Sequence, residues 1–70
     1  MMSTAQKIKI LLSYRNMSQS QLADKMNISR QKLYNKFKRN NFSEDELILI
    51  AKILGCTYYT IFEFPDGFKV

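Results

Sequence analysis

The stretch SQSQLADKMNISRQKLYNKFKR, residues 18–39, predicts two short helices joined by a tight turn. Ser18 and Gln21 have the spacing of a capping box, in which the serine hydroxyl accepts a hydrogen bond from a free N–H at the start of a helix. Asn27 belongs to the residue types that tolerate positive φ best after glycine, so we expect the first helix to end there. The apolar face of this helix consists of Leu22, Ala23 and Met26.

The second helix of the pair carries hydrogen-bonding side chains on its outer face. Ser29 can cap its start, and only Leu33 and Phe37, four residues apart, point toward the core. At about 100° per residue, one outer face holds five polar side chains, with no acid among them. These are Arg30, Gln31, Tyr34, Asn35 and Lys38. Arginine can pair with guanine in the DNA major groove, and Gln or Asn with adenine, so these residue types favour base recognition over an ordinary solvated surface.

Two further helices flank this pair. Capping boxes predict that they begin after Ser3 and Ser43, each with a Gln or Glu three residues later. Apolar residues spaced three and four apart predict that both helices pack in the core. The first stripe consists of Ala5, Ile8 and Leu12, and the second of Leu47, Ile50, Ala51 and Leu54. Gly55 is placed to end the second helix in a left-handed cap.

The residues after Gly55 have a different character. Thr57 could cap a fifth short helix over Tyr58–Phe62, although the aromatic and β-branched residues around Pro65-Asp66-Gly67 also resemble strand, turn and strand. We favour a short helix followed by an extended tail at about residues 63–70. The sequence therefore predicts an all-α fold of five helices with a short extended C-terminal tail, in a single domain over residues 1–70.

Size and composition limit the chemistry that the chain can perform. A chain of 70 residues builds one small core, and a single cysteine without any histidine excludes disulfide bonds and most metal sites. We expect Cys56 to be a small buried residue in a reducing cytoplasm. The longest uninterrupted apolar run, Leu47–Ala51, is far shorter than the ~20 residues of a membrane span, and Lys7 and Lys9 interrupt the apolar part that a signal peptide would need.

No catalytic site, cofactor or small-molecule ligand is indicated. The sequence has no histidine and no glycine-rich phosphate loop. The acids Glu44, Asp45 and Glu46 occupy the first turn of a predicted helix, where negative charge favours the helix dipole. We therefore expect a binding protein and not an enzyme.

Positive charge is concentrated in the first part of the chain. Residues 1–42 contain nine lysines or arginines and one acid, Asp24, whereas residues 43–70 contain two lysines and five acids. This asymmetry favours an anionic partner, either a nucleic acid or a membrane surface. A membrane-surface helix would need Trp or a Leu-rich face opposite its cations, which the basic segment lacks. A small cationic domain can also bind nothing acidic. Among anionic partners nucleic acid is favoured, and the side chains on the outer face of the second helix indicate double-stranded DNA.

From about residue 5 to residue 62, the sequence resembles the lambda-repressor-like, Cro/repressor-type helix-turn-helix DNA-binding family. The first helix of that motif carries a Gln-x-x-Leu-Ala pattern, which is Gln19 to Ala23 here. The residues that then match the family are Met26, Asn27, Ile28, Ser29 and Leu33. The sequence departs from the family at Asn27, where glycine is usual, and at Lys36, where an apolar residue is usual and the ring comes one position later.

The resemblance implies a role for individual side chains in a motif at about residues 18–38. Base edges would be read from Arg30, Gln31 and Asn35, with Tyr34 and Lys32 at the walls of the groove. The base-reading set is Arg30, Gln31, Tyr34 and Asn35. The phosphate-binding set is Ser18, Gln19, Lys32, Lys38, Arg39, Asn40 and Asn41. Phosphate contacts give affinity without sequence information.

The function that the resemblance implies is regulation of transcription, by default repression, in a cytoplasmic, nucleoid-associated protein of bacterial or phage-derived mobile elements. Proteins of this type usually bind DNA as dimers. A rival reading is an antitoxin-like or accessory module whose aromatic tail binds another protein. The tail residues expected to contact a second copy or another partner are Tyr58, Tyr59, Phe62, Phe64 and Phe68. The same residues could instead close the core over the first and last long helices.

Overall fold

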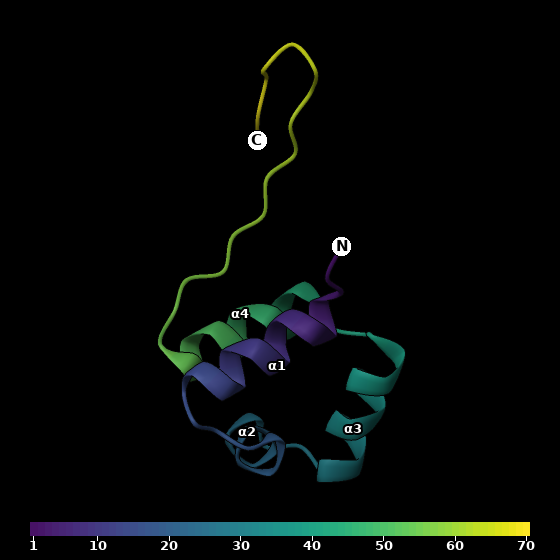
Figure 1. Ribbon diagram of the computed structural model, residues 1–70, viewed down its shortest axis with the longest axis vertical. Coiled ribbons are helices and arrows are strands. Elements are labelled where there is room, and N and C mark those ends of the chain that lie inside the picture. The colour runs from purple at the N-terminus through teal and green to yellow at the C-terminus, as the bar shows by residue number, and fades with distance from the viewer.

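The computed structural model describes all 70 residues and contains four α-helices. They are α1 (Thr4–Tyr14), α2 (Gln19–Met26), α3 (Arg30–Arg39) and α4 (Glu44–Leu54). In Figure 1, α1 and α4 form one side of the helical body, α2 and α3 form the other side, and the residues after α4 project away from it. None of the four helices has the length and apolarity to cross a membrane.

Serine begins every helix, as the sequence predicts. The capping boxes of Ser3, Ser18 and Ser43 are all formed, and the hydroxyl of Ser29 accepts the backbone N–H of Lys32 at 3.0 Å. Each of these bonds satisfies a donor that has no partner inside the helix. The predicted helix ends are also confirmed, because the caps of α2 and α4 have the left-handed conformation, with φ of 60° at Asn27 and 75° at Gly55.

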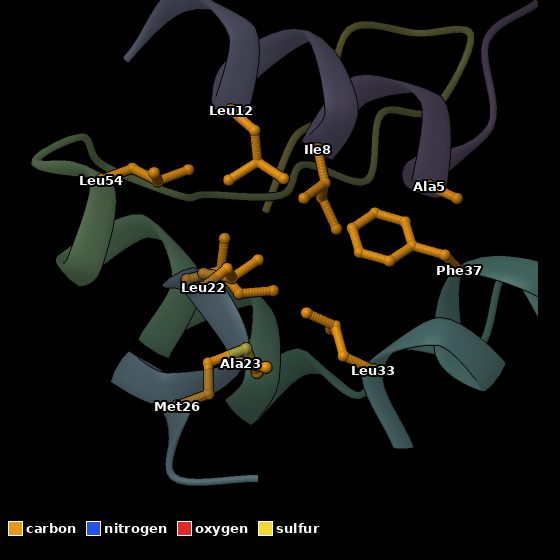
Figure 2. Packing of buried hydrophobic residues seen from close by; sticks show 10 residues of the cluster. Ala5, Ile8, Leu12, Leu22, Ala23, Met26, Leu33, Phe37 and Leu54 are labelled. Atoms are coloured by element: carbon orange, nitrogen blue, oxygen red, sulfur yellow. The ribbon is translucent and has the colours of Figure 1, made fainter. Parts of the chain in front are cut away.

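All four helices contribute to one small apolar core. The most deeply buried large side chains are Leu22, Leu33 and Ile50, from α2, α3 and α4. Figure 2 shows Phe37 and Leu33 pointing from α3 toward Ile8 and Leu22. The predicted stripes of all four helices are therefore the core, except that Leu47 is only half-buried. The α3 helix contributes two buried residues to this core and packs against α2 and α1.

Side-chain hydrogen bonds join the helix ends to one another. Arg15, the residue after α1, donates from Nε to the carbonyl of Leu54 at the end of α4, at 2.8 Å. A Cβ atom on Gly55 would lie only 3.1 Å from Nη2 of this arginine, so glycine serves both the left-handed cap and the close approach. At the other end of α1, the Oδ1 of Asn40 accepts the backbone N–H of Ala5 at 2.8 Å.

The predicted fifth helix over Tyr58–Phe62 is wrong. These residues are extended, and residues 57–61 make no backbone hydrogen bond. A helix of five residues gives too few hydrogen bonds to offset its nucleation, and aromatic or β-branched residues such as Tyr59 and Ile61 lower its propensity further. The chain instead turns back at Pro65-Asp66-Gly67, where Glu63 and Lys69 form an antiparallel bridge.

The expectation of a buried Cys56 is wrong as well. Its backbone N–H donates to the carbonyl of Ala51 at 2.9 Å, which closes the end of α4, but its side chain is exposed. The reason is the left-handed turn at Gly55, because it takes the next residue out of the helical period that places Ala51 and Leu54 in the core.

Candidate nucleic-acid interface

The turn between α2 and α3 is held by backbone hydrogen bonds and a small residue. The N–H of Asn27 donates to the carbonyls of Ala23 and Asp24, and the N–H of Ile28 donates to Ala23 at 3.1 Å. Ala23 is fully buried where the two helices meet, and a larger side chain would separate them. Three residues therefore connect α2 to α3 and fix the angle at which α3 leaves the body.

The outer face of α3 presents two amides and a phenol. Gln31 is exposed, Asn35 is half-buried, and Tyr34 between them has 54% of its surface exposed. The Nε2 of Gln31 donates to the Oδ1 of Asn35 at 3.4 Å, at the upper limit for a hydrogen bond. The structure therefore brings together the predicted base-reading amides, one turn apart, with donor and acceptor groups left for a ligand.

Arg30 lies at the first position of α3, near the only acid of the basic segment. Its Nη2 is 4.0 Å from Oδ2 of Asp24, and both side chains are about 70% exposed, at 71% and 68%. An exposed pair at this distance is weak, since water and salt screen it. The guanidinium of Arg30 is therefore free to exchange the carboxylate for an acceptor on a nucleic acid.

A shallow depression of about 250 Å³ separates α3 from the start of α2. It is lined by Lys9, Gln19, Tyr34, Phe37 and Lys38. Gln19 and Ser20 have backbone N–H groups without partners inside α2, because they occupy its first turn. The depression thus combines two lysines and the Gln19 side chain beside the start of α2, and such donors suit an anion.

Lys9 is a residue that the sequence reasoning missed. Its Nζ lies 5.7 Å from the centroid of the Phe37 ring, so the ring holds the ammonium of α1 beside α3. A helical wheel could have identified it, because Lys9 lies only about 40° from Ala5, at the edge of the buried stripe of α1. A lysine at the border of a core stripe can reach the adjacent helix with its charged end.

The other predicted phosphate-binding residues lie around this depression and beyond it. The hydroxyl oxygen of Ser18 accepts the N–H of Gln21, so only its O–H remains to donate. Lys32 and Arg39 are exposed. Asn40 and Asn41 follow α3, but the Oδ1 of Asn40 is already bound to α1, which leaves only its amide nitrogen for a ligand.

Lys36, the departure from the family pattern, forms an ion pair with Glu46. Its Nζ lies 2.6 Å from Oε2 of Glu46, and the two side chains are only 17% and 25% exposed. Burial alone would raise the pKa of Glu46, but hydrogen bonds from Lys36 and Ser43, together with the charge of Lys36, outweigh it and lower the pKa. The aromatic ring therefore enters the core one position later, at Phe37, while Lys36 joins α3 to α4.

The predicted partner residues of the tail lie apart from this surface. Tyr58 is half-buried beside α1 and α4, whereas Tyr59, Phe62, Phe64 and Phe68 have 57–75% of their surfaces exposed. These residues do not close the core over the two helices, so that reading of the tail is wrong. Their side chains remain available for a partner.

The family model described as a Cro/C1-type HTH DNA-binding domain matches residues 7–67. No curated protein and no solved structure matches the chain. The matched range includes all four helices from Lys7 onward and reaches the turn at Gly67.

Proposed function

Because this chain belongs to the Cro/C1-type helix-turn-helix DNA-binding family, we propose that it regulates transcription by placing α3 in the major groove of a specific double-stranded DNA site. The observation that carries the proposal is the outer face of α3. Its arginine and two amides are exposed or half-exposed on the face opposite Leu33 and Phe37, and no acid stands among them.

Base recognition is assigned to the four predicted residues on this face. Arg30 can give two hydrogen bonds to the O6 and N7 of guanine, and the Gln31 and Asn35 amides can pair with adenine. Tyr34 lies between the two amides and can contact a base or the groove wall through its ring or hydroxyl. The support for these roles is geometric, since the side chains share one face of α3, opposite the face that Leu33 and Phe37 bury in the core.

Phosphate binding is assigned to the residues around that face. The depression between Gln19 and Lys38 is the strongest candidate, because two lysines and a side-chain amide line it. The other members of this set are Ser18, Lys32, Arg39, Asn40 and Asn41. Lys32 and Arg39 are exposed on α3, so their charged ends are available to the phosphates that border a major groove.

The regulator acts as a repressor in this proposal. Obstruction of a promoter by the bound protein is the default effect in this proposal. A homodimer would bind a partly symmetric site, with half-sites about one helical turn apart.

A second candidate function rests on the exposed tail. Its aromatic side chains could bind a different protein, as in an antitoxin-like or accessory module. Selection of bound sequences from random double-stranded DNA by the purified protein tests the main proposal. We expect a short, partly symmetric motif to be enriched. Recovery of random sequences, with binding that depends only on salt, would contradict base recognition.

A further inference from the structure

The basic part of the chain contains a single acid, and that acid lies beside the first residue of α3. Among residues 1–42, Asp24 stands alone against nine lysines and arginines. Its Oδ2 lies 4.0 Å from Nη2 of Arg30. Apart from Lys36, whose partner is Glu46, Arg30 is the only one of the nine cations within ion-pair distance of an acid. Among the residues assigned to base reading, the one that carries a charge is therefore also the one whose charge is balanced.

Neither charge of this pair is placed where it stabilises its own helix. A helix carries partial positive charge at its N-terminus and partial negative charge at its C-terminus, so acids favour the first turn and cations the last. The acids of α4 and the cations at the end of α3 follow this rule. Asp24 instead lies in the last turn of α2, and Arg30 is the first residue of α3. Since both side chains are also largely exposed, helix stability does not explain the pair.

The backbone fixes these two residues on either side of the turn of the motif. The carbonyl of Asp24 accepts the N–H of Asn27 at 3.1 Å, and Asn27 ends α2 in the left-handed conformation. Only three residues separate α2 from α3. In Figure 1, α2 and α3 are joined by this short turn on the side of the body away from the C-terminus. The carboxylate therefore stays near the guanidinium wherever the start of α3 is placed.

The start of a recognition helix is the part that meets base edges in a helix-turn-helix complex. An arginine there can bind two kinds of acceptor, the O6 and N7 of guanine or the oxygens of a phosphate. Only the phosphate is charged, so the carboxylate of Asp24 repels it and does not repel guanine. The repulsion needs no direct contact, because charges interact over about 8 Å at physiological salt. Arginine has more N–H donors than guanine uses, so the carboxylate can keep one of them.

We propose that Asp24 is a positioning residue that sets the specificity of Arg30, because it keeps the guanidinium from binding phosphate. Arg30 then strengthens binding where a guanine lies opposite it and adds little on other sequences. Without the carboxylate, an exposed arginine at the start of α3 attracts the phosphates of any DNA. The inference rests on the proposed function and deepens it, since it names a residue outside the base-reading face that sharpens sequence preference.

A double-mutant cycle on DNA binding tests the inference. Its members are the wild type, Asp24→Asn, Arg30→Ala and the variant with both changes. Selection from random double-stranded DNA by the wild type gives the site, and selection by Arg30→Ala identifies the base pair that Arg30 reads. Affinity is then measured at several salt concentrations for the selected site, for that site with the G·C pair changed to A·T, and for random DNA. Asp45→Asn, an exposed acid of α4 with the same charge change, is the control.

The Asp24→Asn variant should bind random DNA more tightly, because Arg30 becomes free to neutralise one more phosphate. We expect the slope of log affinity against log salt to steepen by about 0.9, which corresponds to roughly eightfold tighter binding at about 0.1 M salt. Affinity for the selected site should rise less than about threefold, because Arg30 already binds guanine there, so the preference for that guanine falls. In the Arg30→Ala background, Asp24→Asn should raise affinity for random DNA no more than the control does.

Four results would overturn the inference. If Arg30→Ala leaves every base preference unchanged, Arg30 reads no base. If Asp24→Asn gives the same gain with and without Arg30, the acid repels DNA by itself. If the gain is equal on the selected site and on random DNA, the preference for guanine does not depend on Asp24. If the gain on random DNA does not exceed that of Asp45→Asn, the effect is one of net charge.

The selection separates this inference from the proposed function. If the wild type enriches a motif and Asp24→Asn keeps the same preference for guanine, base recognition stands and the inference alone fails. If the wild type enriches no motif, base recognition fails and the inference fails with it. The turn uses the backbone carbonyl of Asp24 and not its side chain, so we expect Asp24→Asn to fold normally. Circular dichroism of each variant checks that the four helices remain folded.

Discussion

Gln31 and Asn35 lie one turn apart on the exposed side of α3, joined by a long hydrogen bond of 3.4 Å. Such a bond between solvated amides adds little to the stability of the fold, because water replaces it at almost no cost. It does orient the two amides relative to each other. Each side chain keeps further donors and acceptors that pairing with a base edge would use.

Replacing either amide distinguishes a contact with a base from a contact with the DNA backbone. We expect Gln31→Ala or Asn35→Ala to weaken binding to the selected site by about 1–3 kcal/mol, since each removes paired hydrogen bonds to a base. Binding to random DNA should change little. Titration of both DNAs at one salt concentration measures the difference. An equal loss on random DNA would mean that the residue contacts only the backbone.

For Lys9 and Lys38 we expect an effect on phosphate binding and not on base recognition, because both line the depression next to the start of α2. Lys9→Gln or Lys38→Gln should weaken binding to all DNA and lower the slope of log affinity against log salt by about 0.9 for each phosphate that the variant no longer neutralises. Lys52→Gln, an exposed lysine of α4 with the same charge change, is the control. If the control lowers the slope equally, the effect comes from net charge and not from the depression.

At the scale of the helix, two buried side chains, an ion pair and the hydrogen bond of its cap residue Asn40 join α3 to the other helices. Leu33 and Phe37 enter the core, and Lys36 reaches Glu46 at the start of α4. The pair replaces an apolar contact that the family usually makes at this position. Since both groups are largely buried and hydrogen-bonded, the pair fixes the rotation of α3 about its own axis and so the direction of its outer face.

The ion pair makes stability depend on pH. The folded protein has a lowered pKa at Glu46, so the unfolded chain binds the proton more readily near the ordinary value of 4.5. The pair therefore contributes fully above that value, and its contribution is lost as pH falls below 4.5 through the folded pKa. Between about pH 6 and about pH 3, we expect the wild type to lose about 1 kcal/mol more than Glu46→Gln.

Urea denaturation of both proteins at the two pH values measures this difference. Glu46→Gln is the matched variant because glutamine keeps an acceptor for the backbone N–H of Ser43, as glutamine does in the capping boxes of α1 and α2. The other acids titrate in both proteins, so their effect cancels. Parallel pH profiles for the two proteins would contradict the role of the pair.

The four helices were predictable from local chemistry. Serine caps, left-handed ends and apolar stripes act over a few residues, and each of these signals is visible in the sequence. The fifth helix failed because Tyr58–Phe62 has weak local preferences, so tertiary contacts decide its conformation, and it makes few of them. The outer face of α3 was predictable for the same reason as its inner face, since both follow the helical period.

The long-range contacts of the candidate site were not predictable. The bond from Asn40 to Ala5 joins residues 35 apart in sequence, and the partners Lys36 and Glu46 belong to different helices. Such pairs depend on how the helices pack, which no local pattern specifies. Lys9 was predictable in part. Its place at the edge of the α1 stripe follows from the helical period, but its contact with Phe37 depends on how α1 and α3 pack.

At the scale of the whole molecule, a helical body carries an extended arm, residues 57–70. The structure measures 43 by 24 by 20 Å, and the arm accounts for much of its length. The basic residues lie mainly in α1 to α3, and the arm has no residue in the core. The arm and the α2–α3 pair therefore lie on opposite sides of one small protein.

This division predicts how the protein unfolds when residues 62–70 are removed. The helical body should keep its helices, because residues 62–70 contribute nothing to its core. A dimer gains stability from mass action, so the melting temperature of the wild type should rise with protein concentration, whereas that of the shortened protein should stay constant. At the lowest concentration the two melting temperatures should meet. In so small a domain, 1 kcal/mol shifts the melting temperature by roughly 4–8 °C. If the shortened protein melts below the wild type by more than this even at the lowest concentration, residues 62–70 stabilise their own helical body and not a second copy.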